Sequence, residues 1–357
     1  METSTQGNGK RSSRRKRSYL GLAVALVAVV GVAGVAIDRS GGRDKSQRSG
    51  ALVTTVSEYK NVDTVAGGEG QGTGGGQFNS PQQIVLDAAG KLYVSDMNNN
   101  RVLVWAQGSN ASALVAGGYA PGSAANQLNH PYGVAIDADE NVYIADNYNH
   151  RVMKWAKGAS SGVLVAGTRG YGAADDQLRY PTGVALDADG NVYVADTYNH
   201  RVQKFAPGET LGVTVAGGYG YGSAANQLNR PYGVALDADG NVYVADSDNH
   251  RVMKWAPDAT SGVRVAGTGV GGSGNQGLIT PTGVALDAAG NVYVADSLND
   301  RVQKWAPNAS SGVTVAGGNG NGSAAKQLNV PSGVALDADG NVYVVDSRNN
   351  RVQKWSP

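Results

Sequence analysis

Cysteine is absent from the 357 residues, and phenylalanine occurs only twice. Without cysteine, neither disulfide bonds nor thiolate metal sites can stabilise the fold, although a large domain can be stable outside the cell without them. Apolar runs with a helical period are also scarce, whereas glycine occurs 52 times. These features favour short strands and turns over helices.

A strong net charge is also lacking, since the whole chain carries +1. The distribution is uneven. Residues 1–50 hold 10 Lys and Arg against 3 Asp and Glu, a balance of +7, and the remaining residues hold 20 against 26, a balance of −6. Binding to nucleic acid needs a clustered basic surface, which a mildly acidic globular part does not offer. We therefore expect no nucleic-acid partner.

The first 37 residues are typical of a membrane segment. Residues 1–17 end in a basic cluster, and residues 18–37 are uncharged and rich in Val, Ala and Leu. As a helix, residues 19–37 would rise about 28 Å, close to the hydrocarbon thickness of a bilayer. Because the basic residues come first, we predict a single-pass transmembrane signal-anchor with residues 1–17 as a cytoplasmic tail, a linker at 38–60 and the rest of the chain outside.

A cleaved signal peptide is the alternative to this anchor. Gly34-Val35-Ala36 offers small residues at the positions that a signal peptidase inspects. Cleavage there would release a secreted protein. The apolar run is longer than the usual core of a signal peptide, which favours the anchor.

Residues 61–357 form six repeats with a period of 50, marked by prolines at 81, 131, 181, 231, 281 and 331. In the fourth repeat the pattern predicts strands at 233–237, 241–246, 251–255 and 262–266 with tight turns between them. Four antiparallel strands per unit are typical of a propeller blade. The predicted fold class is therefore all-β, a six-bladed β-propeller of four-stranded blades.

The ends of the repeat region predict how this ring closes. The last repeat stops at Pro357 after its third strand, and a spare fourth strand, residues 62–66, stands before the first repeat. An N-terminal strand that completes the last blade gives every blade four strands and removes the free sheet edges. A linear solenoid is the alternative, but it would need polar caps at its ends, and the sequence shows none.

The pattern Pro-x-Gly-Val-Ala-x-Asp…Gly-Asn-Val-Tyr-Val-Ala-Asp-x-x-Asn-His-Arg-Val resembles the NHL repeat, named after an Asn-His-Leu run, and the resemblance covers residues 62–357. In this chain Arg follows Asn-His in place of Leu. The resemblance implies a six-bladed propeller. Members of the family include binding platforms, sensor domains outside a membrane and a zinc-dependent amidating lyase, so the resemblance leaves the function open.

Residues that occur in all six blades are interpreted as structural. Asp146, Asn149 and Arg151 have counterparts in every blade. The short Asp and Asn side chains can accept backbone N–H groups, and Arg can bind a nearby carboxylate through its fork. Tyr143 in the second strand and Trp155 in the third, with their counterparts, are expected to pack between neighbouring sheets.

Tyrosine and histidine outside the strands are confined to one part of the ring. Nine Tyr and all 4 His lie between residues 119 and 250, in connections that emerge on one face of a propeller. Tyrosine suits recognition of a protein, peptide or glycan, although such rings can also simply cover loop backbone. The candidate ligand-binding residues are Tyr119, His130, Tyr132, Tyr148, His150, Tyr171, Tyr180, Tyr198, His200, Tyr219, Tyr221, Tyr232 and His250. The opposite half carries Thr282, Asn319, Asn321 and Ser332, which we expect to matter little.

The spacing of His150, His200 and His250 argues against a zinc site. With strands about 4.8 Å apart, equivalent points on adjacent blades are on the order of 12 Å apart. Three such side chains cannot all reach a metal at about 2.0–2.1 Å. The turn at residues 237–241 and its counterparts lack the Gly and Glu of a calcium loop, so we interpret them as hairpin turns. We expect no metal and no cofactor.

The predicted function is a membrane-tethered, extracytoplasmic recognition module that binds its ligand on one propeller face without catalysis. The alternative is a secreted propeller hydrolase or lyase, of the metal-dependent lactonase or amidating-lyase type. A purely structural or adhesive role is a third reading. The sequence contains no nucleophile elbow, phosphate loop or pair of glutamates typical of catalysis.

Overall fold

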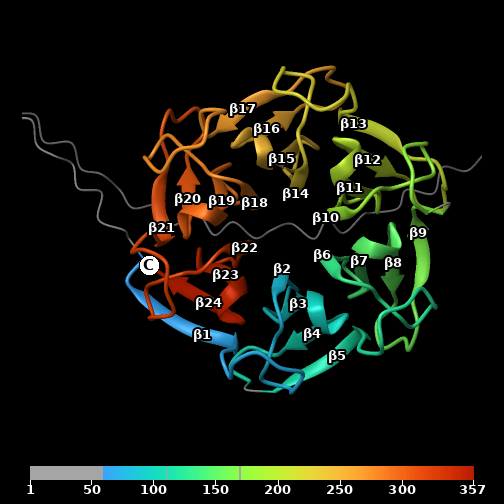
Figure 1. The fold of residues 1–357 in the computed structure, drawn as a ribbon, viewed down its shortest axis with the longest axis horizontal. Helices are drawn as coiled ribbons and strands as arrows, with labels where there is room; N and C mark the ends of the chain where they lie inside the picture. Colours follow the sequence, from blue (N-terminus) through green and yellow to red (C-terminus); the bar gives the residue numbers. More distant parts are fainter. Residues whose placement is uncertain (1–58, 110, 169) are drawn as a thin grey trace, which may run out of the picture. The chain divides into compact units, whose positions relative to one another are not determined.

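The computed structural model describes residues 59–357 except 110 and 169, and this part of the chain forms a ring of six four-stranded sheets (Figure 1). The predicted tail, anchor and most of the linker lie outside the described residues. Within the described part, no helix is long and apolar enough to cross a membrane.

Each blade runs from an inner strand at the axis to an outer strand, with one short 3₁₀ helix between its second and third strands. Blade one holds β2 (Pro81–Leu86), β3 (Leu92–Asp96), η1 (Met97–Asn99), β4 (Arg101–Trp105) and β5 (Ser112–Gly117). Blade two holds β6 (Pro131–Ile136), β7 (Val142–Asp146), η2 (Asn147–Asn149), β8 (Arg151–Trp155) and β9 (Val163–Ala166). Blade three holds β10 (Pro181–Leu186), β11 (Val192–Asp196), η3 (Thr197–Asn199), β12 (Arg201–Phe205) and β13 (Val213–Gly217).

Blades four to six repeat the same order. Blade four holds β14 (Pro231–Leu236), β15 (Val242–Asp246), η4 (Ser247–Asn249), β16 (Arg251–Trp255) and β17 (Val263–Ala266). Blade five holds β18 (Pro281–Leu286), β19 (Val292–Asp296), η5 (Ser297–Asn299), β20 (Arg301–Trp305) and β21 (Val313–Gly317). Blade six holds β22 (Pro331–Leu336), β23 (Val342–Asp346), η6 (Ser347–Asn349), β24 (Arg351–Ser356) and β1 (Asn61–Gly67).

These bounds confirm the predicted strands of the fourth repeat to within one or two residues. The largest difference is at the inner strand, which begins at Pro231 rather than at residue 233. Pro231 pairs with Asp246 at the free inner edge of the sheet. Because a proline has no N–H to donate, an edge position of this kind is one of the few that it can occupy in a sheet.

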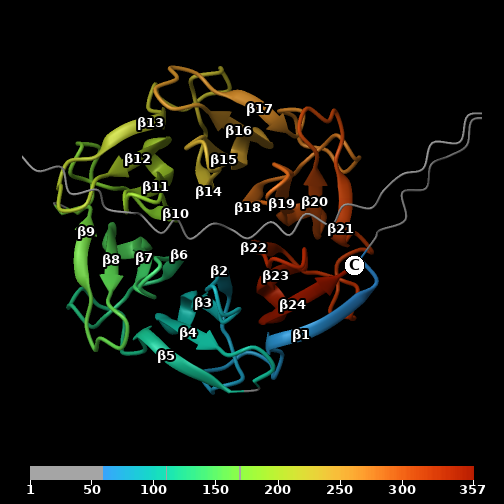
Figure 2. The same cartoon turned by 180° about the vertical axis from the view of Figure 1, so that it is seen from behind.

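Strand β1 closes the ring as predicted. It pairs antiparallel with β24, with Val62 opposite Trp355. Figures 1 and 2 show the blue first strand beside the red last one from both sides. Tyr59, which the prediction placed in the linker, is only 7% exposed and donates its hydroxyl proton to the Gly340 carbonyl at 3.1 Å. Tyr59 therefore belongs to the folded ring.

The hydrophobic core lies between neighbouring blades. Tyr193 of blade three packs in one cluster with Trp255 of blade four, and Tyr143 of blade two packs with Phe205 of blade three. Burial of one such side chain stabilises the fold by roughly 1.5–3 kcal/mol. Because each blade buries its aromatic residues against the next, the predicted packing role of these rings is confirmed, and a blade cannot bury its own core alone.

Removal of the closing strand should open the ring. A variant that lacks residues 1–67 loses β1 and the buried Tyr59, which leaves β24 as an unpaired edge. We expect it to self-associate and to unfold less cooperatively than a variant that lacks only residues 1–58, as measured by gel filtration and denaturant titration. A truncated ring that stays monomeric with an unchanged unfolding midpoint would show that β1 is dispensable.

Candidate functional site

A buried carboxylate organises each blade at the face where the Tyr and His residues were predicted. In blade two, Asp146 is fully buried; its Oδ1 accepts the Asn129 N–H at 2.7 Å, and its Oδ2 accepts hydrogen bonds from Asn149 at 2.8 Å and from Arg151 Nε at 2.7 Å. Burial raises the pKa of Asp146, and these hydrogen bonds oppose that shift. The structural reading of Asp146, Asn149 and Arg151 is confirmed.

The guanidinium of Arg151 also holds the loop between blades. Its Nη1 donates to the Ser123 carbonyl at 2.8 Å, and its Nη2 donates to the carbonyls of Ala124 at 3.3 Å and Gln127 at 3.1 Å. The fork of the guanidinium thus binds loop carbonyls, whereas the carboxylate receives only the Nε–H, which differs from the forked carboxylate contact that we expected. The arginine therefore fixes the loop that leads into the next inner strand.

The residue after each 3₁₀ helix links its blade to the next one. Its side chain accepts the N–H of the residue just before the next inner strand. The acceptor is His Nδ1 at three junctions. There His150 accepts the N–H of Tyr180 at 3.2 Å, His200 accepts that of Arg230 at 3.1 Å, and His250 accepts that of Thr280 at 3.1 Å. At the other three, Asn100, Asp300 and Asn350 accept through Oδ1 at 2.9 Å. Three of the four predicted site histidines thus have a structural role.

These histidine links require an unprotonated Nδ1. Burial lowers the pKa of His150 and His200 from 6.5, and the positive charge of Arg179 lowers both further. The positive charge of Arg230 also lowers the pKa of His200, whereas the negative charge of Asp248 raises it. The folded ring therefore favours the neutral imidazole that the link needs.

The residue before each inner strand presents its side chain from a strained backbone. In all six blades it has φ between 50° and 53°, and none is glycine: the residues are Ser80, His130, Tyr180, Arg230, Thr280 and Val330. This left-handed conformation is unfavourable for a residue with a Cβ, above all a β-branched one, and glycine would adopt it freely. Since the six side chains differ, their shared backbone does not explain their identity, and strain of this kind is commonly retained at functional positions.

Aromatic residues from blades two and three and from their flanking loops gather at this face. Tyr180 is at the centre, with its ring centroid 5.7 Å from that of Tyr148, 4.6 Å from His150 and 5.0 Å from Tyr198. His130 stacks on Tyr148 at 4.2 Å. We call the following set the aromatic arc: His130, Tyr148, His150, Tyr171, Tyr180 and Tyr198, with the cations Arg179 and Arg230.

Two arginines that the sequence analysis missed lie within the arc. The Arg179 guanidinium lies 5.1 Å from the Tyr171 ring centroid and 5.7 Å from that of Tyr198, and its Nε is buried without a hydrogen-bond partner. Arg230 lies 5.0 Å from the same Tyr198 ring and forms an ion pair with Asp248 at 3.6 Å. Cations and rings therefore alternate along the arc. Comparison of the repeats would have pointed to Arg179, because four blades carry Asn at its position and one carries Ile.

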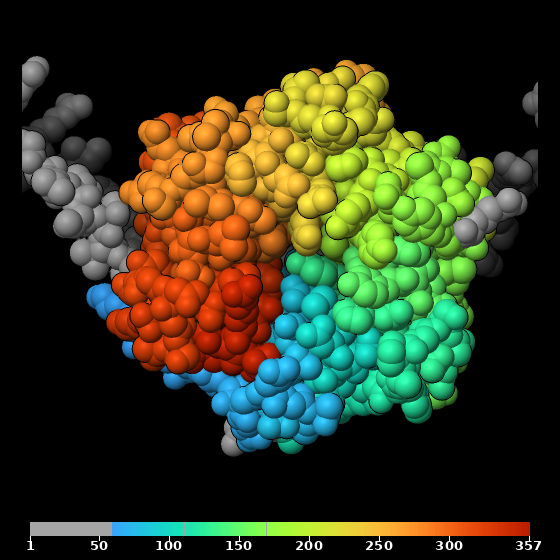
Figure 3. Space-filling view, viewed as in Figure 1, coloured from blue at the N-terminus to red at the C-terminus, as the bar shows by residue number. Residues whose placement is uncertain are grey.

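Tyr132 and Tyr232 lie nearer the axis, as the second residues of β6 and β14. Their ring centroids are 5.6 Å apart, and burial raises the pKa of both hydroxyls. Figure 3 shows one face of the ring, which is hollowed near the axis where the inner strands meet. The prediction that these two tyrosines lie in loops is therefore corrected: they begin inner strands and face one another.

The same strand position has a structural role in blades five and six. Thr282 donates its hydroxyl proton to the Ser332 carbonyl at 2.9 Å, and Ser332 donates to the Gln82 carbonyl at 2.8 Å. Both side chains are buried. The expectation that Thr282 and Ser332 matter little is wrong, because each ties its blade to the next.

The remaining predicted site residues lie apart from the arc. Tyr221 pairs with His200 at 5.7 Å, outside the continuous chain of ring contacts. Tyr119 and Tyr219 are 57% and 61% exposed, and neither contacts another aromatic ring in the described part of the chain. Among the described residues, no group of three or more His, Asp or Glu side chains is placed to hold a metal ion.

Comparison with known families identifies the repeat. The model of the NHL repeat matches residues 128–155, 178–205, 228–255, 278–305 and 328–355, which is one segment in each of blades two to six. No curated protein sequence matches the chain significantly.

Solved structures share the fold at low sequence identity. A Bacteroides thetaiotaomicron protein of unknown function is 18% identical with a TM-score of 0.64, over 83% of this chain and 75% of its own. An auxiliary nutrient binding protein from Bacteroides ovatus is 14% identical with a TM-score of 0.61, over 83% and 76%. A gluconolactonase from Xanthomonas campestris is 14% identical with a TM-score of 0.58, over 78% and 86%. At these identities the likeness shows the fold alone.

The histidine links should make the ring sensitive to acid. Because the folded-state pKa of His150 and His200 is lowered, the stability from these links is present above the unfolded pKa of 6.5 and is lost as the pH falls below it. Each lost link should cost about 1 kcal/mol. We expect the free energy of unfolding, measured by denaturant titration, to decrease as the pH is lowered through this range.

A matched variant isolates the links from other acid effects. The double change H150N/H200N places at these junctions the residue that blades one and six already use. Asparagine tolerates the left-handed backbone and does not titrate. The variant should lose part of the acid sensitivity. An identical pH dependence in the two proteins would show that the histidines remain neutral throughout the range.

Proposed function

We propose that this NHL-repeat protein, a six-bladed β-propeller, is a recognition module that is tethered to a membrane, faces outward and binds an acidic ligand on the aromatic arc without catalysing a reaction. The ligand classes are a protein segment, a peptide or a glycan that carries carboxylate groups. The observation that carries the proposal is the placement of Arg179 between two tyrosine rings.

Arg179 has the features of a binding group rather than of a structural one. The structural arginines, such as Arg151, bind a carboxylate and loop carbonyls. Arg179 has neither kind of side-chain partner among the described residues, and its Nε is buried and unpaired. A buried donor without a partner is costly, so the arrangement favours a ligand that supplies the acceptor. A carboxylate fits a guanidinium best, through two parallel hydrogen bonds.

The rings around Arg179 suit a ligand that lies flat on the surface. Tyr148 and Tyr171 are 51% and 52% exposed, while Tyr180 and Tyr198 are half-buried. Rigid tyrosine rings supply contact area at little cost in conformational entropy, and their hydroxyls supply hydrogen bonds. The fold likeness to the nutrient binding protein is compatible with a binding role, but the proposal rests on the composition of the face.

The tether should place the ring outside the membrane. If residues 18–37 form the anchor, the full chain should fractionate with membranes, and protease added from outside should digest the ring, because the basic residues before the segment keep the N-terminus in the cytoplasm. Immunoblotting of membrane and soluble fractions measures this. Release into the medium with a new N-terminus near residue 37 would establish a cleaved signal peptide instead.

Binding should depend on Arg179 and Tyr198. Arrays of peptides and glycans, each with acidic and neutral members, provide the probes, and we expect the acidic members to bind. The change R179N introduces the asparagine that four other blades have at the equivalent position, and Y198N introduces the asparagine that blade one has at the position of Tyr198. Each variant should weaken binding of the best probe by about 2 kcal/mol, or roughly 30-fold.

Stability provides the control for these variants. Leu298 is 56% exposed, and substitutions at exposed loop positions usually change the free energy of unfolding by no more than about 0.5 kcal/mol. L298N changes the position equivalent to Tyr198 in blade five, far from the arc in sequence, and should leave both binding and stability unchanged. If R179N and Y198N lower stability while binding per folded molecule is unchanged, the arc is loop packing and the proposed site is wrong.

A further inference from the structure

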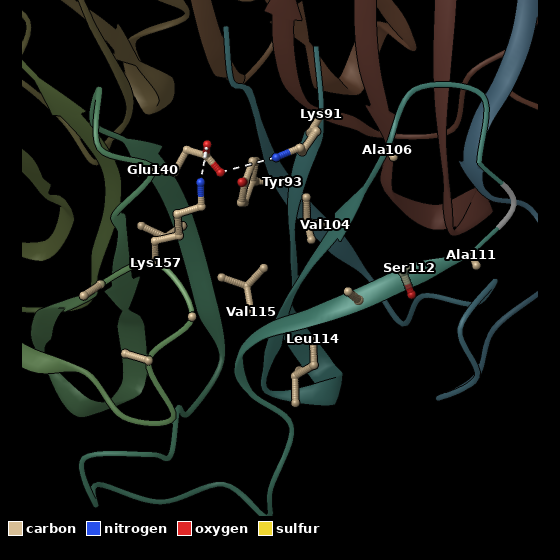
Figure 4. Close-up of a pocket in the computed structure, with 15 residues that line it drawn as sticks. Lys91, Tyr93, Val104, Ala106, Ala111, Ser112, Leu114, Val115, Glu140 and Lys157 are labelled. Carbon is tan, nitrogen blue, oxygen red and sulfur yellow. Dashed lines mark hydrogen bonds and ion pairs between the residues drawn. The ribbon is translucent and has the colours of Figure 1, made fainter. Parts of the chain in front are cut away.

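The junction between blades one and two has two different edges. At one edge lies a cavity of about 480 Å³, whose lining includes the turn between the first two strands of each blade (Figure 4). In antiparallel sheets these turns emerge at the edge opposite to the connections that carry the aromatic arc. The loop that holds His130 leads from β5 into β6 and belongs to that opposite edge. The cavity and His130 therefore lie at opposite edges of one junction.

The charged groups at the cavity balance one another within the protein. Glu140 Oε1 is 2.7 Å from Lys157 Nζ, and its Oε2 is 3.3 Å from Lys91 Nζ. Asp87 Oδ2 lies 3.5 Å from the same Lys91 Nζ, so two carboxylates face two ammonium groups. Figure 4 shows Glu140 between the two lysines. These four groups therefore present no net charge to a ligand.

The edge that carries the arc holds the one histidine of the chain whose side chain does not link two blades. His130 stacks on Tyr148, with ring centroids 4.2 Å apart and planes inclined by 21°. Its Nδ1 lies 2.9 Å from Asn129 Oδ1. Because an amide oxygen can only accept a hydrogen bond, Nδ1 carries the proton of the neutral ring and Nε2 is unprotonated. Among the described residues, Nε2 has no hydrogen-bond partner.

Proton uptake has different consequences at the two kinds of histidine. In His150, His200 and His250, Nδ1 accepts a backbone N–H of the next blade, so protonation of Nδ1 breaks the link. In His130, Nδ1 already donates to Asn129, so a proton on Nε2 leaves that hydrogen bond in place and creates a second donor. His130 is thus the one of the four histidines that becomes charged without the loss of a hydrogen bond.

The surroundings of His130 determine when it becomes charged. The groups that face it, all uncharged at neutral pH, are Asn129 of its own loop, Asn100 of blade one and Tyr148 of η2. Asp146, which accepts the Asn129 N–H, is balanced by Arg151. Burial lowers the pKa of His130 from 6.5, although the face of a tyrosine ring favours a cation. His130 is therefore neutral in weakly alkaline solution and takes up a proton as the pH falls below 6.5.

We propose that His130 makes binding on the aromatic arc dependent on pH, because it holds a second carboxylate of the ligand more tightly when it is protonated. This inference rests on the proposed function, in which Arg179 binds the first carboxylate. The rings of Tyr148 and Tyr180 follow His130 along the arc, so a ligand that reaches both cations is extended and carries at least two carboxylates. Arg230 occupies the position of His130 in blade four, where it supplies a permanent cation.

The direction of the pH dependence follows from this contact. A carboxylate beside His130 favours the imidazolium and raises the pKa of His130 in the complex. By linkage, the ligand binds more tightly as the pH falls through the range in which free His130 is still neutral.

The test uses the full chain in lipid nanodiscs and an acetylated, amidated peptide of sequence Glu-Ala-Glu-Ala-Glu, with Gln-Ala-Gln-Ala-Gln as its neutral analogue. Alternate side chains of an extended peptide lie on one side, and glutamates with a pKa of about 4.3 stay mostly ionised at about pH 5.5. By isothermal titration calorimetry, we expect the acidic peptide to bind at least roughly threefold more tightly at about pH 5.5 than at about pH 7.5. The neutral analogue should show no such increase. Equal affinity of the acidic peptide at both pH values, or no saturable binding at either, would overturn the inference.

Two variants of His130 use residues that other blades already carry at this position. H130S introduces the serine of blade one and H130R the arginine of blade four, both of which adopt the same left-handed backbone there. H130S should bind the acidic peptide equally at the two pH values. H130R should bind it at about pH 7.5 at least as tightly as the wild type does at about pH 5.5, because its charge is permanent. An acid-dependent increase in H130S equal to that of the wild type would assign the effect to another group and contradict the inference.

The variant R179N separates this inference from the proposed function. If both hold, R179N weakens binding of the acidic peptide at both pH values and keeps the acid-dependent increase. Weaker binding by R179N, together with the same pH dependence in the wild type and H130S, would refute the role of His130 and leave the proposed function standing. Unchanged affinity in R179N would refute the proposed function and, with it, this inference.

Discussion

The buried carboxylate at the end of each second strand is the interaction on which the rest of the ring depends. In blade two, Asp146 joins a backbone N–H of the incoming loop, the amide of Asn149 and the guanidinium of Arg151. The same arginine holds the carbonyls of that loop. A charge buried in this way is tolerated only with all of its partners, and removal of one typically costs about 3–5 kcal/mol. The repeated Asp, Asn and Arg therefore fix the loops of one face against the sheets.

A rigid frame of this kind frees other positions to vary. The residue before each inner strand keeps the same left-handed backbone in all blades, while its side chain changes from Ser80 to Tyr180 to Arg230. The frame fixes where each side chain is presented, and the sequence of each blade determines its chemistry. The aromatic arc arises from such departures, through its aromatic and cationic residues.

The contacts between blades explain why some variable positions are not available for function. Thr282 and Ser332 tie neighbouring inner strands through their hydroxyls. Tyr132 and Tyr232 occupy the equivalent position in blades two and four, but their rings point toward each other. In these two blades another side chain makes the bond to the next blade: Asn147 donates to the Pro181 carbonyl, and Ser247 donates to the Pro281 carbonyl. Where a neighbouring side chain makes the inter-blade bond, a large ring can stand at the axis.

The sequence by itself determined the propeller, its six blades and the closing strand, because a 50-residue period and one spare strand admit few arrangements. It also confined Tyr and His to one face, since alternate connections of antiparallel strands share an edge. Only the tertiary structure decided which of them meet. Tyr148, Tyr180 and Tyr198 come from three separate segments, and the imidazoles of His150, His200 and His250 act as links between blades. Contacts across a blade junction depend on side-chain directions that no local pattern encodes, so the position of Arg179 between two tyrosine rings emerged only in three dimensions.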